Sequence, residues 1–300
     1  MNPVILGYAQ LARPANLPTA AADILAGVAI AGIIPASVSE LPLESGLSLK
    51  VLQLVFASIF LYAGGVILND VFDRKIDKIE RPERPIPSGL IPWSSAAIFG
   101  FAMLLLGILF AFFTNLKSGM IAVILAASIV LYDAFSKKYD FIGPLNMGVC
   151  RGLNLILGMS VLGIIPSALY ALIPLVYIFA ITMISRGEVH GNNKNHLLWA
   201  AVLYILVIFA VLTIVPISLA NIYELVPYLL FFSVLIFRPL IRAYRVNSPE
   251  NIKKAVIGGV LALILLDASL AVGFSSWWYG LLVVLLLPLS IWLSRIFAVT

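Results

Sequence analysis

The segment VLQLVFASIFLYAGGVIL at residues 51–68 is an apolar run, and the segment NDVFDRKID at residues 69–77 follows it directly. A membrane-spanning helix needs about 20 predominantly apolar residues, and the run has close to that length. The second segment carries three aspartates and two basic residues, which belong at a membrane surface rather than in hydrocarbon. Together the two segments predict a helix that crosses a bilayer and ends in a polar site.

The composition of the whole chain supports a membrane protein. Of its 300 residues, 62% are hydrophobic and 11% are charged, whereas a soluble domain is about 45–50% apolar and about 25% charged. These values exclude a water-soluble globule and a disordered chain, and the single cysteine, Cys150, excludes a disulfide scaffold. The apolar runs are continuous and do not alternate, which argues against a membrane β-barrel.

Ten apolar runs are predicted to form membrane spans, and no long soluble domain separates them. They lie at residues 18–37, 49–68, 94–114, 118–135, 142–163, 167–186, 197–219, 223–239, 254–274 and 278–297. We therefore expect a single all-α integral-membrane domain over residues 1–300, with the lipid bilayer as its surroundings.

The distribution of Lys and Arg supports this count. Basic residues cluster in the loops after the even-numbered runs, whereas the odd-numbered loops hold only Lys50 and Lys117. Cytoplasmic loops carry an excess of basic residues, so we expect both termini and the even-numbered loops on the cytoplasmic side of the cell inner membrane. The net charge of +5 then belongs to loops and indicates no nucleic-acid partner. The first twelve residues contain no Lys or Arg, so we expect no removable signal peptide.

Asp23, Arg151 and Asp267 are charged residues that fall within predicted spans. Asp23 and Arg151 lie near the predicted cytoplasmic ends of their spans, where they are able to extend to the surface. An arginine that stays in hydrocarbon needs an anion beside it. Asp267 lies in the middle of its span, and we expect it to be a buried, hydrogen-bonding carboxyl.

The acidic segment predicts a binding site for a metal and a diphosphate. On a helix, Asp70, Asp73 and Asp77 recur at i, i+3 and i+7 and therefore share one face. Oxygen ligands suit Mg²⁺, which proteins usually hold through one or two carboxylates together with substrate phosphates. The alternative is a solvated loop whose carboxylates pair with neighbouring basic residues.

The segment RPERPIPSG at residues 81–89 favours the first interpretation. Its prolines exclude a helix and predict an extended, stiff loop. Such a loop places Arg81 and Arg84 beside the acidic face, and arginine is suited to bidentate phosphate contacts.

The pattern NDxxDxxxD, formed by Asn69, Asp70, Asp73 and Asp77, together with the RPxRPIPSG pattern that follows it, resembles the first signature of the UbiA superfamily of intramembrane prenyltransferases. This resemblance implies a UbiA-like bundle, usually of nine spans, with two parallel four-helix repeats. It also implies transfer of a prenyl group from a prenyl diphosphate to an acceptor, using Mg²⁺.

The resemblance implies a second acidic motif in the loop SRGEVHGNNK at residues 185–194. Glu188 and Gly191 match that motif, but Asn192 stands where an aspartate is expected. Asparagine still offers a carbonyl oxygen, although without charge. The two histidines, His190 and His196, are interpreted as polar loop residues.

The site residues that follow from the resemblance fall into two groups. The expected metal ligands are Asn69, Asp70, Asp73, Asp77 and Glu188, and among these Asp70, Asp73 and Glu188, together with Lys137, are expected to be catalytic. The expected substrate-binding residues are Arg81, Arg84, Tyr132, Arg151, Asn154 and Asn192, and Lys137 is expected to contact phosphate. The region from Tyr132 to Asn154 is also similar to a divergent branch of UbiA-like proteins called EboC.

The sequence thus predicts Mg²⁺-dependent transfer of a prenyl group to an aromatic or other small acceptor. The neutral Asn192 leaves an alternative open: a UbiA-like protein that binds or transports an isoprenoid phosphate or a prenylated compound without catalysing transfer. A purely structural scaffold would leave the acidic face and the arginine-containing loop unexplained.

Overall fold

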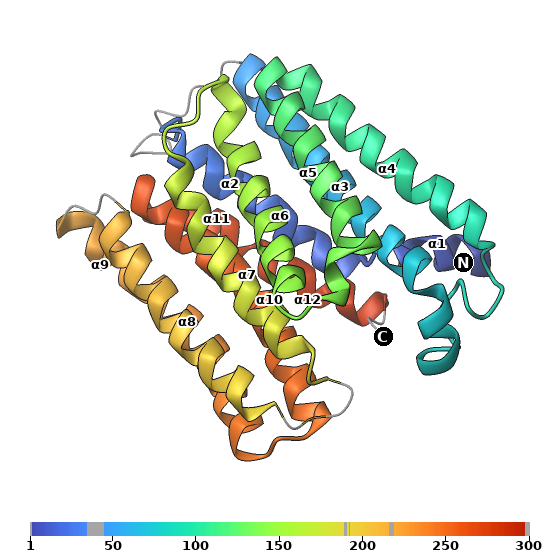
Figure 1. The fold of residues 1–300 in the computed structure, drawn as a ribbon. Coiled ribbons are helices and arrows are strands. Elements are labelled where there is room, and N and C mark those ends of the chain that lie inside the picture. The colour runs from blue at the N-terminus through green and yellow to red at the C-terminus, as the bar shows by residue number, and fades with distance from the viewer. Residues whose placement is uncertain (1, 35–44, 189–190, 192, 216–218, 298–300) are drawn as a thin grey trace.

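The computed structural model describes residues 2–34, 45–188, 191, 193–215 and 219–297. Its twelve α-helices are packed side by side in one bundle (Figure 1). They are α1 (Pro3–Leu11), α2 (Leu17–Ile30), α3 (Ser45–Glu80), α4 (Trp93–Thr114), α5 (Leu116–Ala134), α6 (Ile142–Met159), α7 (Leu172–Ser185), α8 (Lys194–Ile214), α9 (Leu219–Arg245), α10 (Pro249–Phe274), α11 (Trp277–Val284) and α12 (Leu286–Ile296). Short 3₁₀ turns are η1 (Pro14–Asn16), η3 (Ser136–Lys138), η4 (Ser160–Leu162) and η5 (Ala168–Ala171). The described residues contain no strand.

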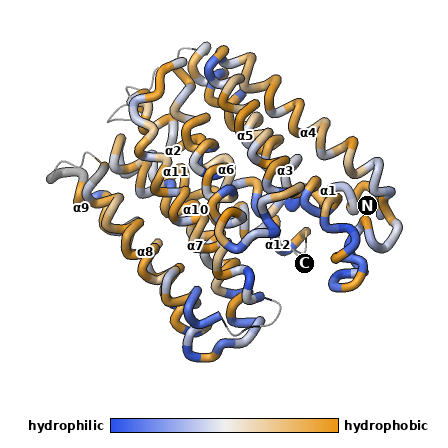
Figure 2. Tube along the Cα trace, in the orientation of Figure 1, coloured by the Kyte–Doolittle hydropathy of each residue, from blue (hydrophilic) through white to orange (hydrophobic). Residues whose placement is uncertain are grey.

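Within the described residues, nine helical segments are long and apolar enough to cross a membrane, and the chain is a multi-pass membrane protein. These segments correspond to the second through tenth predicted spans, with α11 and α12 together forming the last. Side chains on the outside of the bundle are apolar and exposed: Ile98 is 72% exposed and Phe209 is 65% exposed. Figure 2 shows hydrophobic residues along most of α4 and α8, as contact with lipid requires.

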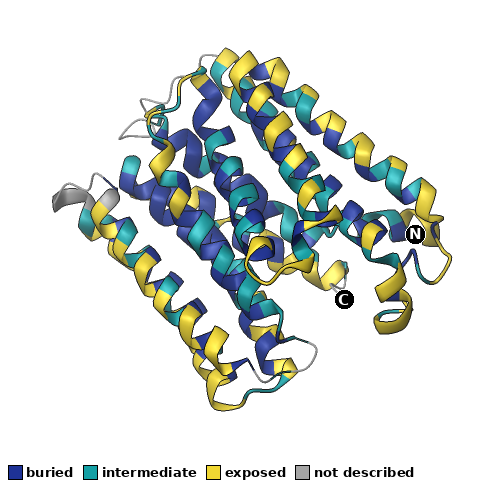
Figure 3. Ribbon diagram, viewed as in Figure 1, coloured by how far each residue is buried: buried dark blue, intermediate teal, exposed yellow. Residues whose placement is uncertain are grey.

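The first predicted span differs from the other nine. Its helix, α2, has 14 residues and is therefore about 21 Å long, which is shorter than a hydrocarbon core of about 30 Å. Residues 35–37 of the predicted run lie outside the described part of the chain. Almost every residue of α2 is buried, and α2 contacts α3, α6 and α10. Figure 3 shows this buried interior along α2 and α10.

Helix α2 packs unusually close to α6. A Cβ on Gly27 would lie 2.6 Å from the carbonyl oxygen of Leu155, and a Cβ on Gly158 would lie 2.6 Å from that of Ile24. Both contacts are with backbone, which has no freedom to rotate away. Glycine at these positions therefore allows the two helices to approach, and this approach places Asp23 beside α6.

The close approach leads to a stability prediction. Gly27→Ala is expected to destabilise the protein by about 1–3 kcal/mol, because the added methyl group overlaps the backbone of α6. Gly46→Ala is the matched control, since a Cβ there meets nothing within 4 Å. Unfolding in detergent, followed by tryptophan fluorescence, measures both changes, and equal midpoints for the two variants would contradict this packing.

Two clusters of the hydrophobic core lie mainly in different halves of the chain, and α2 and α6 contribute residues to both. One cluster joins α2 to α3, α4 and α5 through residues such as Leu54, Leu104 and Leu125. The other joins α6 and α7 to α8, α9 and α10 around Tyr177 and Phe232. The acidic segment ends α3, and the loop with Glu188 follows α7, so each lies after the second helix of its half.

The length of α3 brings the acidic segment out of the bilayer. Its 36 residues extend about 54 Å, against a hydrocarbon core of about 30 Å. The prolines after α3 predicted an extended loop, and this prediction was wrong. The segment is folded into consecutive turns. The amide of Ser88 donates to the carbonyl of Arg84, and that of Ile91 donates to the carbonyl of Pro85. These turns bring Arg84 back against α3.

Candidate functional site

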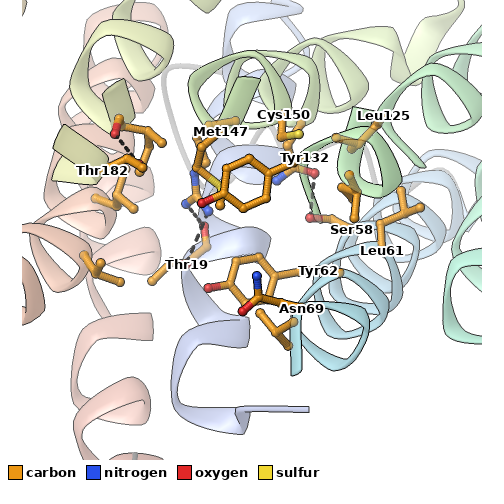
Figure 4. A pocket seen from close by; sticks show the side chains of 18 of the residues that line it. Thr19, Ser58, Leu61, Tyr62, Asn69, Leu125, Tyr132, Met147, Cys150 and Thr182 are labelled. Atoms are coloured by element: carbon orange, nitrogen blue, oxygen red, sulfur yellow. Dashed lines mark hydrogen bonds between the residues drawn. The ribbon is translucent and has the colours of Figure 1, made fainter. Parts of the chain in front are cut away.

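A cavity of about 310 Å³ lies among α3, α5, α6, α7 and α10. Its walls are mostly apolar, with residues such as Leu61, Ile129 and Ile181. Polar side chains line two parts of it. Asn69, Tyr132 and Asp133 lie near the end of α3, and Thr19, Ser58, Arg151 and Asn154 lie further into the bundle. Figure 4 shows Asn69, Tyr132, Thr19 and Ser58 around the cavity. The cavity therefore combines an apolar space with polar groups near the end of α3 and deeper in the bundle.

The predicted acidic face forms on α3, and two arginines pair with it. Arg84 Nη1 lies 2.8 Å from Asp77 Oδ2 and 3.1 Å from Asp70 Oδ1, and Arg13 Nη2 lies 2.6 Å from the same Asp70 oxygen. Asp70, Asp77 and Arg84 are all buried. Arg84 thus lies between two carboxylates of the face, and Asp77 points toward the loop after α3.

Arg13 is a site residue that was not predicted from the sequence. It lines the cavity, and its backbone has a φ of 46°, in the left-handed region. A non-glycine residue in that region carries about 1–3 kcal/mol of strain, which the surrounding structure must hold in place. The only signal in the sequence was the Arg13-Pro14 pair directly before the first apolar run.

A second group of polar residues joins α3 to the end of α5. Lys137 Nζ lies 2.6 Å from Asp73 Oδ1 and 3.9 Å from Asp133 Oδ1. Asn69 Nδ2 donates to Asp133 Oδ1 at 2.8 Å. The structure therefore places Lys137 beside the acidic face, as expected, and Tyr132 lines the cavity next to it. Asp133 was not predicted as a site residue. The signal in the sequence was a carboxylate at the end of an apolar run, the same signal that predicted Asp70 as a metal ligand.

The expected metal ligands do not form a ready coordination sphere. Among the described residues, no three His, Cys, Asp or Glu side chains converge as metal ligands. The donor chemistry nevertheless fits a hard divalent cation, because Asp70, Asp73, Asp133 and Asn69 present oxygen atoms from two adjacent helices. In this structure the three carboxylates are paired with Arg13, Arg84 and Lys137, whose charges also suit phosphate oxygens.

The second loop lies close to the first. Partial burial raises the pKa of the Glu188 carboxyl, against the opposing effects of the nearby Arg81 and Lys253. Arg186 donates to the backbone carbonyl of Tyr139 at 2.5 Å and forms an ion pair with Asp140, which ties the end of α7 to the α5–α6 loop. Glu188 is therefore close enough to Arg81 for that charge to act on its carboxyl.

The structure does not test every residue expected in this loop. Asn192 and His190 lie outside the described residues. His196, at the start of α8, belongs to no metal-binding cluster among the residues that the structure describes.

Arg151 and Asn154 both line the deeper part of the cavity. Arg151 does not extend to the surface but is buried, with its Nε 2.8 Å from Asp23 Oδ2 and its Nη2 3.9 Å from Asp267 Oδ2. Asn154 Nδ2 donates to Asp23 Oδ2 at 2.7 Å and to the carbonyl of Ala20 at 3.1 Å. The anion that a membrane-buried arginine needs is thus supplied by the protein itself.

Comparisons with known proteins agree with this arrangement. The model of the UbiA prenyltransferase family matches residues 24–258. The chain is 40% identical to digeranylgeranylglyceryl phosphate synthase of Methanococcoides burtonii over 157 residues, which cover 52% of this chain and 55% of that protein. It is 31% identical to the synthase of Saccharolobus solfataricus over 194 residues, covering 63% of this chain and 65% of that one. The matches thus span between half and two thirds of the length of these relatives.

Two solved structures share the fold. A UbiA homolog from Archaeoglobus fulgidus, bound to GPP and Mg²⁺, superposes with a TM-score of 0.59 at 15% identity, over 88% of this chain and 99% of that chain. The apo structure of a UbiA homolog from Aeropyrum pernix K1 superposes with a TM-score of 0.62 at 12% identity, over 84% of this chain and 96% of that chain.

Proposed function

Because the chain belongs to the UbiA prenyltransferase family, we propose that it transfers a prenyl group from a prenyl diphosphate to a small acceptor inside the membrane, with Mg²⁺ as cofactor. The observation that carries this proposal is the cavity, in which an apolar space ends at a cluster of carboxylates and cationic side chains. An isoprenoid tail is apolar and its diphosphate is anionic, so the two parts of such a donor match the two parts of the cavity. We place the acidic face on the cytoplasmic side, where the basic loops lie.

The residues at the polar end have distinct proposed roles. Arg13, Lys137 and, from the neighbouring loop, Arg81 bind the diphosphate oxygens and stabilise the charge that accumulates on them as the bond to the prenyl carbon breaks. Arg84 holds Asp70 and Asp77 in place. The apolar walls keep water away from the allylic cation, which would otherwise be hydrolysed.

A divalent ion fits the oxygen donors of Asn69, Asp70, Asp73 and Asp133, with Glu188 as the proposed contribution of the second loop. When bound, the ion neutralises charge on the leaving diphosphate as a Lewis acid. Lys137 and Arg13, which pair with these carboxylates here, are then free to contact phosphate.

The proposal is tested by pyrophosphate release from the purified protein in lipid. The protein is given geranyl, farnesyl and geranylgeranyl diphosphates with a panel of hydroxyl-bearing acceptors. Release that requires both Mg²⁺ and an acceptor supports a transferase. Binding of the prenyl diphosphate without any release supports the second candidate, a binding or transport protein, which is favoured by the pairing of every carboxylate at the cavity mouth with a cation.

Lys137→Met is expected to raise the KM for the prenyl diphosphate about tenfold to hundredfold, because a charge-assisted hydrogen bond to phosphate contributes about 1.5–3 kcal/mol. Lys138→Met is the matched control, since its side chain is exposed and next in sequence. Steady-state kinetics on both variants measures the effect. An unchanged KM in the Lys137 variant would remove this lysine from the diphosphate site.

A further inference from the structure

Three charged side chains from different helices meet at the deeper part of the cavity, where Arg151 lines the wall and Asp23 and Asp267 lie behind it. Arg151 of α6 is 7% exposed, and Asp23 of α2 and Asp267 of α10 are both 0% exposed. Arg151 contacts Asp23 at 2.8 Å and Asp267 at 3.9 Å. One buried cation is therefore surrounded by two carboxyl groups.

The contacts of these groups imply that one of the two carboxyls carries a proton. Both carboxyls are fully buried and contact the same guanidinium group. Neither oxygen of Asp267 meets an N–H or O–H donor among the described residues, and Asp23 Oδ1 meets none either. If both carboxyls were ionised, the cluster would hold an uncompensated negative charge away from water. With one proton, the three groups have a net charge of zero, which is the arrangement that a low-dielectric interior favours.

The neutral cluster determines what the cavity wall presents to a ligand. The Nε of Arg151 forms an ion pair with Asp23, and its Nη2 donates to the carbonyl oxygen of Thr19 at 2.5 Å. Its Nη1 makes only a long contact of 3.4 Å with Thr19 Oγ1. That hydroxyl in turn donates to the carbonyl of Asn16, so its oxygen is able to accept a further hydrogen bond. One donor and one acceptor thus remain available side by side.

No uncompensated cation lines the described wall of the cavity. Its charged side chains are Arg13, Asp133 and Arg151. Arg13 is paired with Asp70, Arg151 is paired with two carboxyls, and Asp133 is itself acidic. An anionic group at the deeper end would therefore add unpaired negative charge beside Asp23 and Asp267.

From these observations we propose that the deeper end of the cavity is an acceptor subsite that selects an uncharged, hydroxyl-bearing head group. Asp23 and Asp267 are its specificity-determining positioning residues, because they cancel the charge of Arg151. A hydroxyl there accepts from Arg151 Nη1 and donates to Thr19 Oγ1. This proposal rests on the proposed function, since it names the acceptor class of the same site.

The test compares molecules that differ by one charge. Binding of 4-hydroxybenzyl alcohol and of 4-hydroxybenzoate to the full chain in lipid nanodiscs is measured by isothermal titration. The wild-type protein is expected to bind the alcohol at least tenfold more tightly. The double variant Asp23→Asn, Asp267→Asn leaves Arg151 without an ionised partner, so the cluster gains a net positive charge. It is expected to lower the preference at least tenfold by improving binding of the carboxylate.

Ser269→Ala is the matched control, because Ser269 is buried on the same helix and bonds only within it, to the carbonyl of Leu265. Its preference is expected to equal that of the wild type. Tighter binding of the carboxylate by the wild type, binding of neither compound, or an unchanged preference in a folded double variant overturns the proposal. If that variant does not fold, the wild-type ratio decides by itself.

The binding assay does not depend on transfer. A chain that prefers the alcohol and releases no pyrophosphate supports this subsite and contradicts the proposed enzyme. A chain that releases pyrophosphate with a prenylglyceryl phosphate but not with the matching prenylglycerol supports the enzyme and overturns the subsite.

Discussion

Asp73→Asn is expected to lower Mg²⁺-dependent release of pyrophosphate by at least about 100-fold, the size of effect seen when one group that stabilises developing charge is removed. Asp73 lies on the exposed side of the acidic face and pairs with Lys137 at 2.6 Å, so it is the carboxylate best placed between the cavity and the solvent. Asparagine keeps the shape and one oxygen donor but removes the charge. The measurement is the initial rate at saturating prenyl diphosphate, over a range of Mg²⁺ concentrations.

Glu80→Gln is the matched control for this substitution. Glu80 is the last residue of α3, and its side chain is exposed, so the same loss of charge outside the site is expected to leave the rate within about twofold. A further control is to raise the Mg²⁺ concentration, which is expected to recover part of the lost rate if Asp73 binds the ion. A rate that is unchanged in Asp73→Asn would remove this residue from the proposed mechanism.

Arg84→Met is expected to destabilise the protein by about 3–5 kcal/mol, because removing one partner of a buried ion pair leaves the other charge uncompensated. Arg84 is 6% exposed and is in contact with both Asp70 and Asp77. Methionine fills a similar volume without charge, so the loss reflects the two carboxylates and not a cavity. Reversible unfolding in mixed micelles measures the change.

Arg81→Met provides the comparison for Arg84, because Arg81 lies three residues earlier in the same segment and is only half-buried. Its effect on the free energy of unfolding is expected to stay within about 0.5 kcal/mol. Equal stabilities for the two variants would show that Arg84 does not support the acidic face. A rescue of Arg84→Met by adding Asp77→Asn would confirm that the unpaired carboxylate causes the loss.

The parts of the fold that depend on neighbouring residues were predictable from the sequence. Composition and run length identified a multi-pass membrane protein, and nine of the ten predicted spans are present as helices in the described residues. The acidic face required only the helical period, because Asp70, Asp73 and Asp77 lie within two turns of one helix. The loop after α3 was predicted less well. Proline excluded a helix there, but turns formed where an extended chain was expected, because Arg84 folds back onto two carboxylates.

The parts that depend on packing between distant segments were decided by the tertiary structure alone. The sequence shows no reason for Arg13 to meet Asp70, 57 residues away, or for Asn69 to meet Asp133, 64 residues away. It also marks Asp23, Arg151 and Asp267 only as three separate charges within apolar runs. Their meeting depends on the close approach of α2 and α6 at Gly27 and Gly158.

The sequence by itself therefore determined the class of protein, the helices and the chemistry of the acidic segment, since each follows from local composition and periodicity. The tertiary structure decided which charges neutralise one another, that α2 is short and enclosed, and where a cavity remains between the helices. The physical reason is that burial removes water, so every charge brought into the bundle must find its partner on another helix, and only the packed arrangement shows which helix that is.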